Sequence, residues 1–561
     1  MTKAMTVLNT LLLGVVVMVS VACTSSANSD QADVAATTKQ KQAMKDNLRA
    51  HIEFLADDLL RGRDTGSVEY EIAARYVASH FKQFGLQPAG ENNSWFQSVP
   101  FTKSTPDKSS LEMIVHGTQS SDKSISFTYP EQFMSGANAL TTQDDIRAKL
   151  VFVGYGIVSK EMNLNDYANL DVKGKIVVAL TGRPAYLPSE QGAHVSSRHE
   201  KRRNAAERGA AGYITVHTPL KEKSTTYARM TEGAGRADFK FQLKEGGIFG
   251  QYPTIKGTAY IHTDAARQLF WAADIDLNEI FAQIEQDKVP TGFDMNVEVS
   301  LKRKSAHQTI YSSNVAGILV GSDPTLKHEY LVYSAHLDHI GVHGKGEDKI
   351  NNGALDNASG IAIMLETVRR FTQGERPKRS ILFVAVTAEE KGLLGSNYFA
   401  RYPTVPIESM IANINLDMPI ITYPFSDIIA FGAQHSNLEG FVKTATQSMN
   451  LTLSPDPMPE RAIFTRSDHY SFVQQGVPAI FLVPGFTSSD PTINGAQLFG
   501  QFFTQHYHRP SDDISQPIDY DVGAVFTEVN FAIGKQIANT QQRPRWNEGD
   551  YFGDMFSKNG H

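Results

Sequence analysis

The sequence has a single cysteine, Cys23, among 561 residues. One thiol cannot form an intramolecular disulfide, and it cannot supply a cysteine-based zinc site. Any metal ion that the chain binds must therefore be held by histidine, aspartate and glutamate. A strong excess of one charge is also missing, with 53 lysines and arginines against 60 aspartates and glutamates. This balance provides no basic surface for nucleic acid, so we expect no nucleic-acid partner.

The start of the chain lacks a hydrophobic run long enough for a membrane span, because its apolar stretch covers only residues 11–22. Lys3 precedes this stretch, and Ser20-Val21-Ala22-Cys23 at its end resembles the lipobox of bacterial lipoproteins. We interpret residues 1–23 as an export signal and expect Cys23 to become the lipidated first residue. Ser20 replaces the usual aliphatic residue, so ordinary signal-peptide cleavage is the alternative. Both interpretations predict export, either to the periplasm or outer membrane as a lipoprotein or as a secreted protein, with membrane contact only through the lipid.

At this length one compact core is not expected, so two domains plus appendages are predicted. Residues 24–41 are rich in Ser, Thr, Ala and Gln without periodicity, as in a flexible tether. Beyond them Leu48, Ile52, Leu55 and Leu59 fall on one helical face, and residues 61–67 are interpreted as a turn before a second helix. The sequence pattern changes over residues 135–299, where strand-like stretches surround a polar, alanine-rich helix at 201–209.

After residue 300 the pattern alternates between strands and helices. Short apolar stretches rich in β-branched residues occupy residues 314–320, 330–334, 381–386, 410–416 and 478–483. Such runs are typical of strands that are covered on both faces. The clearest helix between them has one apolar face, made of Ile361, Met364, Leu365 and Val368. We therefore expect an α/β fold, with a mixed, largely parallel sheet sandwiched by helices.

Side chains of the metal-binding kind follow several of these elements. They are His336, Asp338, Asp356, Glu389, Glu390, Asp417 and His508. Ligands converge at the carboxyl edge of such sheets, so these residues can meet although they are far apart in the chain. Each of them alone could be a helix cap or a surface group. Together, so many like charges at one edge would repel unless a cation held them. The sequence therefore predicts a metal site.

The order and spacing of these residues resemble a known family. The matching motifs are His336-x-Asp338, Asp356-Asn357-Ala358-Ser359-Gly360, Glu389-Glu390, Asn415-Leu416-Asp417-Met418 and Tyr507-His508. They are similar to those of the secreted di-zinc aminopeptidases of the bacterial leucyl aminopeptidase type, to which glutamate carboxypeptidase is related. The resemblance covers nearly the whole mature chain. It implies the zinc exopeptidase fold, two zinc ions and the hydrolysis of N-terminal amino acids from peptide substrates.

The same resemblance divides the chain into domains. Residues 42–134 and 300–545 would form the peptidase domain, and residues 546–561 would be a C-terminal tail. Residues 135–299 resemble the β-rich protease-associated domain that many secreted peptidases carry as an insert. No cluster of reactive residues stands out in this insert, so we expect a lid or a substrate-selecting module.

The family's metal ligands transfer to five residues. By the resemblance, Asp356 bridges the two zinc ions. His336 and Asp417 would hold one ion, and Glu390 and His508 the other, together with a shared water. Carboxylate and imidazole ligands without thiolate suit a hydrolytic zinc site that keeps open positions.

Two further carboxylates are expected to take part in catalysis without binding metal. Asp338 lies two residues from His336, on the same side of an extended segment, so its carboxylate can accept the second imidazole proton. Glu389 would take a proton from the water shared by the ions and later pass it to the leaving amine.

Three other positions bear on the site. Ser467-Asp468-His469 also matches the family, and we interpret it as a segment that shapes the site rather than as ligands. Phe464 stands where some relatives have a tyrosine that stabilises the oxyanion. Another hydrogen-bond donor or the metal ions must therefore stabilise the oxyanion here. His506 is a rival of His508 as the last ligand, although the Tyr-His-x-Pro pattern favours His508.

Other functions compete with the aminopeptidase prediction. A carboxypeptidase or dipeptidase on the same fold stays open, because motifs do not identify the pocket that selects the substrate terminus. Glutaminyl cyclases use one zinc, and the five-ligand set disfavours them. A non-catalytic binding protein, as the transferrin receptor is in the wider superfamily, would have lost ligands. A phosphodiesterase would need a phosphate-binding loop that is not evident. The residue preference, the oligomeric state and the choice of zinc over cobalt or manganese stay open.

Overall fold

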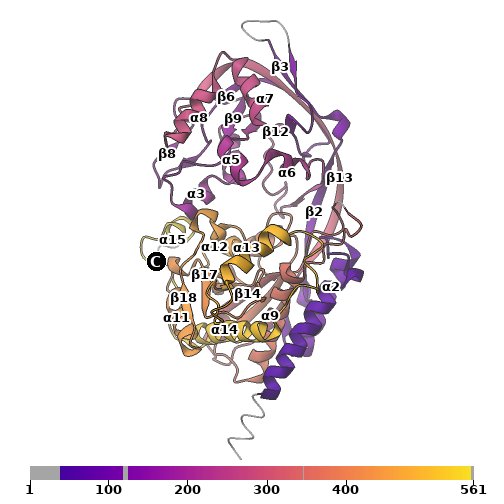
Figure 1. Ribbon diagram of the computed structural model, residues 1–561, viewed down its shortest axis with the longest axis vertical. Helices are drawn as coiled ribbons and strands as arrows, with labels where there is room; N and C mark the ends of the chain where they lie inside the picture. The colour runs from indigo at the N-terminus through magenta and orange to yellow at the C-terminus, as the bar shows by residue number, and fades with distance from the viewer. Residues whose placement is uncertain (1–37, 118–123, 345, 558–561) are drawn as a thin grey trace, which may run out of the picture.

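One long strand, β13 (Phe293–Leu319), runs through both halves of the molecule. It pairs with β6 (Gln143–Phe152) up to Lys304, and with β2 (Phe96–Pro106) from Ser305 onward. The computed structural model describes residues 38–117, 124–344 and 346–557. Figure 1 shows two lobes, one above the other, joined along one side by β2 and β13. We call residues 107–304 the inserted lobe and the rest of the described chain the main lobe.

The main lobe is built on a mixed sheet. Its strands follow one another in the order β18 (Thr452–Ser454), β17 (Asp427–Phe431), β19 (Ala479–Pro484), β16 (Met410–Asn415), β14 (Tyr330–His336), β15 (Ser380–Val386), β13 and β2. The central strands from β19 to β15 are parallel, whereas β13 and β2 run antiparallel to their neighbours. The short strand β1 (Gln87–Pro88) pairs with β13, and β11 (Asp238–Phe241), which belongs to the inserted lobe by sequence, pairs with β2. The predicted mixed, largely parallel sheet is confirmed, and the five predicted strands all form.

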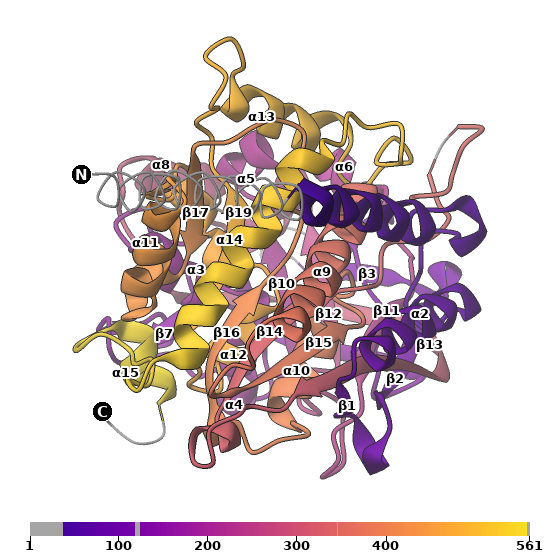
Figure 2. The same ribbon diagram turned by 90° about the horizontal axis from the view of Figure 1, so that it is seen from below.

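Helices cover both faces of this sheet. One face carries the helix at 38–55, α2 (Val68–Gln83), α9 (Ser359–Gln373), α11 (Leu438–Ser448) and α14 (Tyr520–Asn539), and Figure 2 shows α9 and α14 side by side. The other face carries α10 (Leu394–Arg401) and α12 (His469–Val473). The apolar face predicted for α9 is fully buried. Leu59 was wrongly placed on a buried helical face, because the first helix ends at residue 55 and Leu59 is 83% exposed.

The inserted lobe has a second mixed sheet with its own core. Its strands follow in the order β4 (Ile125–Ser126), β3 (Glu112–His116), β13, β6, β9 (Ile176–Leu180), β10 (Gly212–Val216), β12 (Gly257–Ile261) and β5 (Phe133–Met134). Six α-helices accompany it within its described residues: α3 (Ser189–Val195), α4 (Arg198–Glu207), α5 (Pro219–Ser224), α6 (Tyr227–Thr231), α7 (Thr263–Trp271) and α8 (Leu277–Glu285). A small hairpin, β7 (Val158–Ser159) with β8 (Leu164–Asn165), lies apart from the sheet. Since β3, β4 and β5 pair within this sheet, the lobe begins before the predicted boundary at residue 135.

The C-terminal end of the chain packs on the main lobe, whereas residues 1–37 lie outside the described residues. The expected C-terminal tail is instead packed up to residue 557: α15 (Tyr551–Phe556) buries Phe552 against Phe464, and the Trp546 indole donates to the Gly476 carbonyl over 2.9 Å. The predicted export signal and Cys23 lie outside the described residues. The first described helix already includes residues 38–41 of the expected tether. Within the described ranges, no helix combines the length and the apolar character that crossing a bilayer requires.

Candidate metal centre

The carboxyl ends of the central strands bring the predicted metal-binding residues together. His336 is the last residue of β14, and Asp417 comes two residues after the end of β16. Glu389 and Glu390 follow β15. Because these strands are parallel neighbours, their ends meet at one edge of the sheet, as the sequence predicted.

His336, Asp356 and Asp417 form a first group that can hold a metal ion. His336 Nε2 lies 3.0 Å from Asp417 Oδ1 and 3.3 Å from Asp356 Oδ1. All three side chains are buried. Donor atoms at this separation can share one ion with bonds of about 2.0–2.2 Å to each.

A second group forms around Glu390. His508 Nε2 lies 2.9 Å from Glu390 Oε2 and 3.4 Å from Asp356 Oδ2. His339 Nδ1 lies 2.8 Å from Glu390 Oε1 and 3.8 Å from Asp356 Oδ2. Asp356 therefore presents Oδ1 to the first group and Oδ2 to the second, which is the geometry of a bridging ligand. His339 was missed by the sequence analysis, although it directly follows Asp338.

The rival ligand His506 does not join either group. Its Nδ1 lies 3.0 Å from the Ser511 hydroxyl and 3.0 Å from Gln516 Nε2. His508 is the histidine of this segment that reaches the carboxylates. It has a left-handed backbone, with φ at 57°.

Asp356 is held from several directions. Its backbone N–H and that of Leu355 donate to the Asp512 carboxylate over 3.0 and 2.9 Å. The Asn357 side chain donates to the Leu416 carbonyl over 3.0 Å and accepts the Met418 N–H over 3.0 Å. The turn Ala354–Ala358, which leads into α9, is thereby fixed to the segment that carries Asp417.

The chemistry of this cluster fits divalent cations. Asp356 is buried, and its Oδ2 accepts no hydrogen bond from any part of the chain that the structure describes. An unpaired buried carboxylate oxygen beside other carboxylates is costly unless a cation faces it. Carboxylate oxygens and imidazole nitrogens are ligands that zinc accepts in hydrolytic sites. The residues present therefore fit zinc at both groups.

The electrostatics of the cluster point the same way. Burial raises the pKa of Glu389 well above its usual range, and the Glu390 and Asp417 carboxylates raise it further against the opposing effect of His336. Although burial lowers the pKa of His508, the Glu390 and Asp356 carboxylates raise it to about 10. The pKa of His336 is likewise raised by Asp417 and Glu389 despite burial. Protons and metal ions therefore compete for the same imidazole nitrogens.

Asp338 does not have the role that the sequence predicted. His336 Nδ1 lies 3.0 Å from the backbone carbonyl of Asp338, not from its carboxylate. The carboxylate instead accepts the Glu389 N–H over 3.0 Å, the Glu390 N–H over 3.4 Å and the Thr65 hydroxyl over 3.0 Å. The predicted side-chain pairing is wrong. The carbonyl orients the imidazole, while the carboxylate fixes the backbone that carries Glu389 and Glu390.

Arg63 is a buried cation beneath the cluster that the sequence analysis interpreted only as part of a turn. Its guanidinium donates to four backbone carbonyls: those of Leu55, Leu337 at 2.9 Å, Asn352 at 2.7 Å and Gly353 at 3.2 Å. Burial lowers its pKa to about 10, while the Asp356 and Asp512 carboxylates act in the opposite direction. Arg63 therefore ties the segment after His336 to the segment before Asp356.

Ser467 connects the site-shaping segment to a metal-binding residue. Its hydroxyl donates to Asp417 Oδ2 over 2.5 Å and accepts from Asn415 Nδ2 over 2.7 Å. Asn415 Oδ1 accepts in turn from the Ser334 hydroxyl over 2.6 Å. This chain of hydrogen bonds leaves Asp417 Oδ1 facing His336. The neighbours Asp468 and His469 belong to neither metal-binding group of the described residues.

The phenyl ring of Phe464 provides no hydroxyl at the site. It is fully buried and packs against Phe552, with ring centroids 5.2 Å apart. Tyr507 is the tyrosine next to the metal-binding residues, stacked on His508 with centroids 3.8 Å apart. Burial and the Asp356 and Glu390 carboxylates raise its pKa well above its ordinary value, so the phenol stays protonated and can donate.

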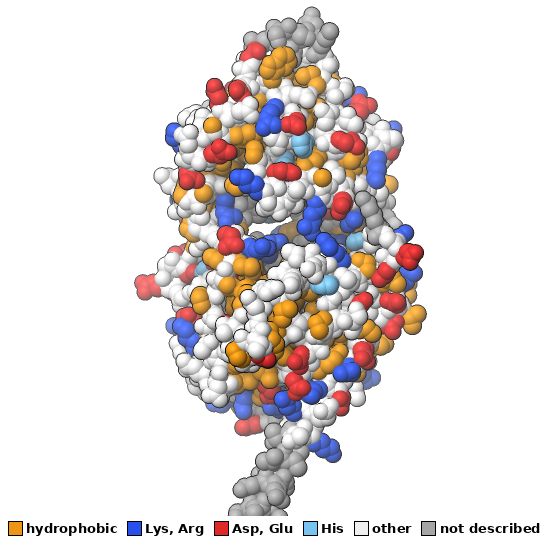
Figure 3. Space-filling view, viewed as in Figure 1, with side chains coloured by type: hydrophobic (Ala, Val, Ile, Leu, Met, Phe, Trp, Pro, Cys, Tyr) orange, Lys and Arg blue, Asp and Glu red, His pale blue; other side chains and the backbone are white. Residues whose placement is uncertain are grey.

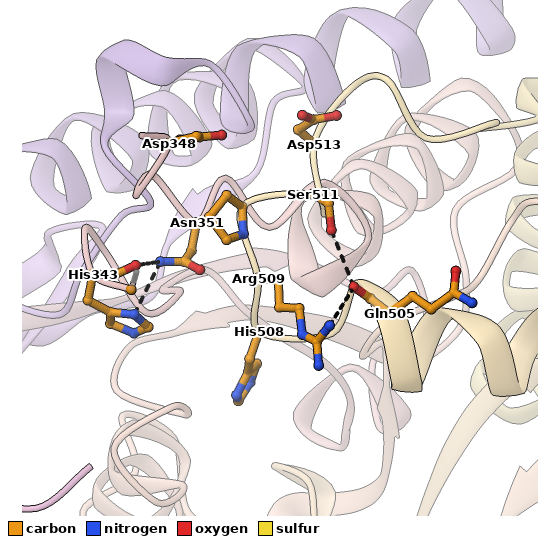
Figure 4. A pocket seen from close by; sticks show the side chains of 10 residues that line it. His343, Asp348, Asn351, Gln505, His508, Arg509, Ser511 and Asp513 are labelled. Carbon is orange, nitrogen blue, oxygen red and sulfur yellow. Dashed lines mark hydrogen bonds between the residues drawn. The ribbon is translucent and has the colours of Figure 1, made fainter. Parts of the chain in front are cut away.

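A cavity of about 570 Å³ opens beside His508. Figure 4 shows His343 and Asn351 on one side of it and Gln505, Arg509 and Ser511 on the other. The molecule is hollowed between the lobes, and Lys and Arg side chains gather around this opening in Figure 3. The metal centre is thus accessible from the side of the second group.

Comparisons with known proteins agree with this geometry. Residues 314–533 match the model of peptidase family M28. The mouse (Mus musculus) protein "Aminopeptidase NAALADL1" is 34% identical over 150 residues, which is 24% of this chain and 18% of that protein. "Aminopeptidase YwaD" of Bacillus subtilis is 35% identical over 124 residues, which is 22% of this chain and 24% of that protein.

The solved structure of an aminopeptidase from Aneurinibacillus sp. strain AM-1 superposes with a TM-score of 0.51 at 19% identity, covering 89% of this chain and 95% of that chain. This likeness concerns the fold. The chain spans less than a quarter of the length of either curated relative. The family match includes the predicted metal-binding residues and the strands that carry them. Through residues 314–533, the chain is similar to peptidase family M28.

Proposed function

We propose that this protein is an aminopeptidase that removes N-terminal amino acids from peptides and holds two zinc ions. The observation that carries the proposal is the position of Asp356, with Oδ1 facing His336 and Oδ2 facing His508. One aspartate shared by two imidazole–carboxylate sets suits a pair of ions rather than one. The match of residues 314–533 to the model of peptidase family M28 supports the reaction, and the aminopeptidase names of the similar proteins support the choice of the N-terminus.

Two zinc ions at these groups would supply Lewis-acid activation of a water molecule and of the scissile carbonyl. Glu389 is the residue that moves the proton. Its carboxylate is coupled electrostatically to His336, Glu390 and Asp417, and burial raises its pKa. It accepts a proton from the attacking water as the new C–O bond forms. It then gives this proton to the amine nitrogen as the C–N bond breaks, which returns Glu389 to its carboxylate form.

Other side chains of the site hold these groups in place. The Asp338 carboxylate accepts the backbone N–H groups of Glu389 and Glu390. The Ser467 hydroxyl holds Asp417. The hydroxyl of Tyr507 can donate to the oxygen that becomes negative in the transition state, in place of the tyrosine that Phe464 replaces.

The proposal is tested with a panel of aminoacyl 4-nitroanilides beside N-acetylated peptides of the same sequence. Purified protein with two zinc ions per chain should release 4-nitroaniline, and a chelator should abolish the release until zinc is added back. N-acetylation should block the reaction. Release of C-terminal residues from acetylated peptides would identify a carboxypeptidase instead, and activity that survives complete removal of metal would refute the metal-dependent mechanism.

We further propose that the chain is exported and anchored to a membrane by a lipid on Cys23. The support is the lipobox-like Ser20-Val21-Ala22-Cys23 after an apolar stretch at the start of the sequence. Cells that express the protein and are fed an alkyne-labelled fatty acid should label the native chain but not a Cys23→Ser variant. Export without label on the native chain would support ordinary signal-peptide cleavage.

A further inference from the structure

His339 occupies a position that the proposed mechanism does not yet use. Its side chain is fully buried. The ring lies against Gly353, whose φ is +63° and where a Cβ would come within 2.7 Å of the His339 ring. The His339 N–H donates to the Arg63 carbonyl over 3.3 Å. Gly353 therefore limits the ring on one side, and the hydrogen bond to Arg63 fixes the backbone that carries the ring.

The Glu390 carboxylate lies between two imidazoles. His339 Nδ1 is 2.8 Å from Oε1, and His508 Nε2 is 2.9 Å from Oε2. If Asp356, Glu390 and both imidazoles bound one zinc ion, four protein ligands would complete a tetrahedron. A hydrolytic zinc site keeps a position open for water or substrate. One of the two imidazoles must therefore have another role.

The geometry distinguishes the two imidazoles. His508 Nε2 lies nearer to the shared Asp356 Oδ2, at 3.4 Å against 3.8 Å for His339 Nδ1. The His508 side chain is 34% exposed and lines the open cavity, whereas His339 is fully buried. The 2.8 Å contact of His339 has the length of a charge-assisted hydrogen bond to a carboxylate.

We propose that His339 is a positioning residue that donates its Nδ1–H to Glu390 Oε1 and so leaves Oε2 to bind metal together with His508. The inference rests on the proposed two-zinc site. The Nδ1–H tautomer is the one it requires, and Nε2 has no hydrogen-bond partner among the residues that the structure describes. Carboxylate ligands fixed in this way bind metal more tightly, because less freedom is lost on binding.

The test compares two amide substitutions, His339→Asn and His339→Gln. The Asn side chain places an N–H near the position of Nδ1, whereas the longer Gln side chain places it near the position of Nε2. Both are polar and uncharged, so general effects on folding are matched. Zinc content per chain is measured by elemental mass spectrometry. The affinity for the more weakly bound zinc ion is measured by competition with a chromogenic chelator.

His339→Asn should keep two ions with an affinity within about threefold of the wild type, and His339→Gln should lose about 10- to 100-fold in affinity for one ion. Equal loss in both variants would make His339 a metal ligand and overturn the proposal. Two tightly held ions in both variants would overturn it as well. Thermal unfolding of the chelated proteins serves as the folding control, and a variant that unfolds below the assay temperature is measured below its own transition.

These outcomes are separable from a failure of the proposed function. If the wild type holds two ions but cleaves no peptide, the aminopeptidase proposal fails while the Asn and Gln affinities still decide the role of His339. If the wild type holds no second ion, the site that His339 would serve does not exist and both proposals fail.

Discussion

Replacing Arg63 by methionine tests whether the hydrogen bonds of the buried guanidinium stabilise the segments that carry the candidate metal centre. Arg63 is 1% exposed in the fold, and its side chain donates to four backbone carbonyls. All four carbonyls would lose the hydrogen bond from the guanidinium. The Gly353 carbonyl would still accept the Ala358 N–H, so three would be left without a donor: those of Leu55, Leu337 and Asn352. Methionine fits the apolar part of the volume but donates nothing.

Each buried carbonyl left without a donor costs about 1–3 kcal/mol, so the loss for three is about 3–9 kcal/mol. Part of this is offset, because the variant no longer buries a charge. We therefore expect the free energy of unfolding of the chelated protein to fall by about 3 kcal/mol, the lower end of that range and a large part of a typical domain's stability.

The measurement is urea unfolding followed by circular dichroism, with chelator and again with saturating zinc. Arg61→Met is the matched control, because Arg61 has nearly the same backbone φ, 44° against 45°, but its side chain is 59% exposed and makes one ion pair, with Glu69. This control should change the free energy of unfolding by less than about 1 kcal/mol. An Arg63→Met protein as stable as the control would refute the supporting role.

Three further predictions concern catalysis and stability. Glu389→Gln should retain two zinc ions yet lose about 10²- to 10⁴-fold in kcat, because the general base is gone; near-normal turnover would contradict its role. Tyr507→Phe should lower kcat by about 10- to 100-fold without changing zinc content if its phenol stabilises the oxyanion, and an unchanged kcat would leave that role to the metal ions. His435 lies 2.7 Å from Glu190 and 2.6 Å from Asp550, which raise its pKa from 6.5 to about 9 despite burial. Its contribution to stability should therefore be complete below pH 6.5 and disappear as the pH rises through about 9, so the difference in unfolding free energy between the wild type and His435→Gln should shrink over that interval, and a difference independent of pH would be the contrary result.

Much of the main lobe could be predicted, because its signals are local. The five strands read from apolar, β-branched runs all form, and the side chains after them converge where parallel strands end. His336, Asp356 and Asp417 are within reach of one another for this reason. The residues at which the inserted lobe begins and ends could not be predicted from the sequence as well. β13 is continuous in sequence but belongs to two sheets, and nothing in its own pattern marks the change of partner at Lys304.

The contacts of Arg63 could not be predicted from a sequence pattern. Its hydrogen bonds go to backbone carbonyls, and every residue has one. The acceptor segments after His336 and before Asp356 are almost 300 residues away in the chain. Without an alignment, a loop arginine between two helices is most often solvated, and only the fold shows that this one is enclosed.

The errors at Asp338 and His339 have one physical origin. Placing Asp338 beside His336 relied on the alternation of side chains along an extended strand. That rule holds within β14, but β14 ends at His336, and the segment after it pairs instead with the loop around Asp64. Beyond the strand end the Asp338 carboxylate turns to the Glu389 and Glu390 backbone, and His339 comes to lie against Glu390. The same departure from the strand gives Glu390 two imidazole neighbours, which is why the Asn and Gln variants of His339 are the sharpest test of how this site would hold the proposed second ion.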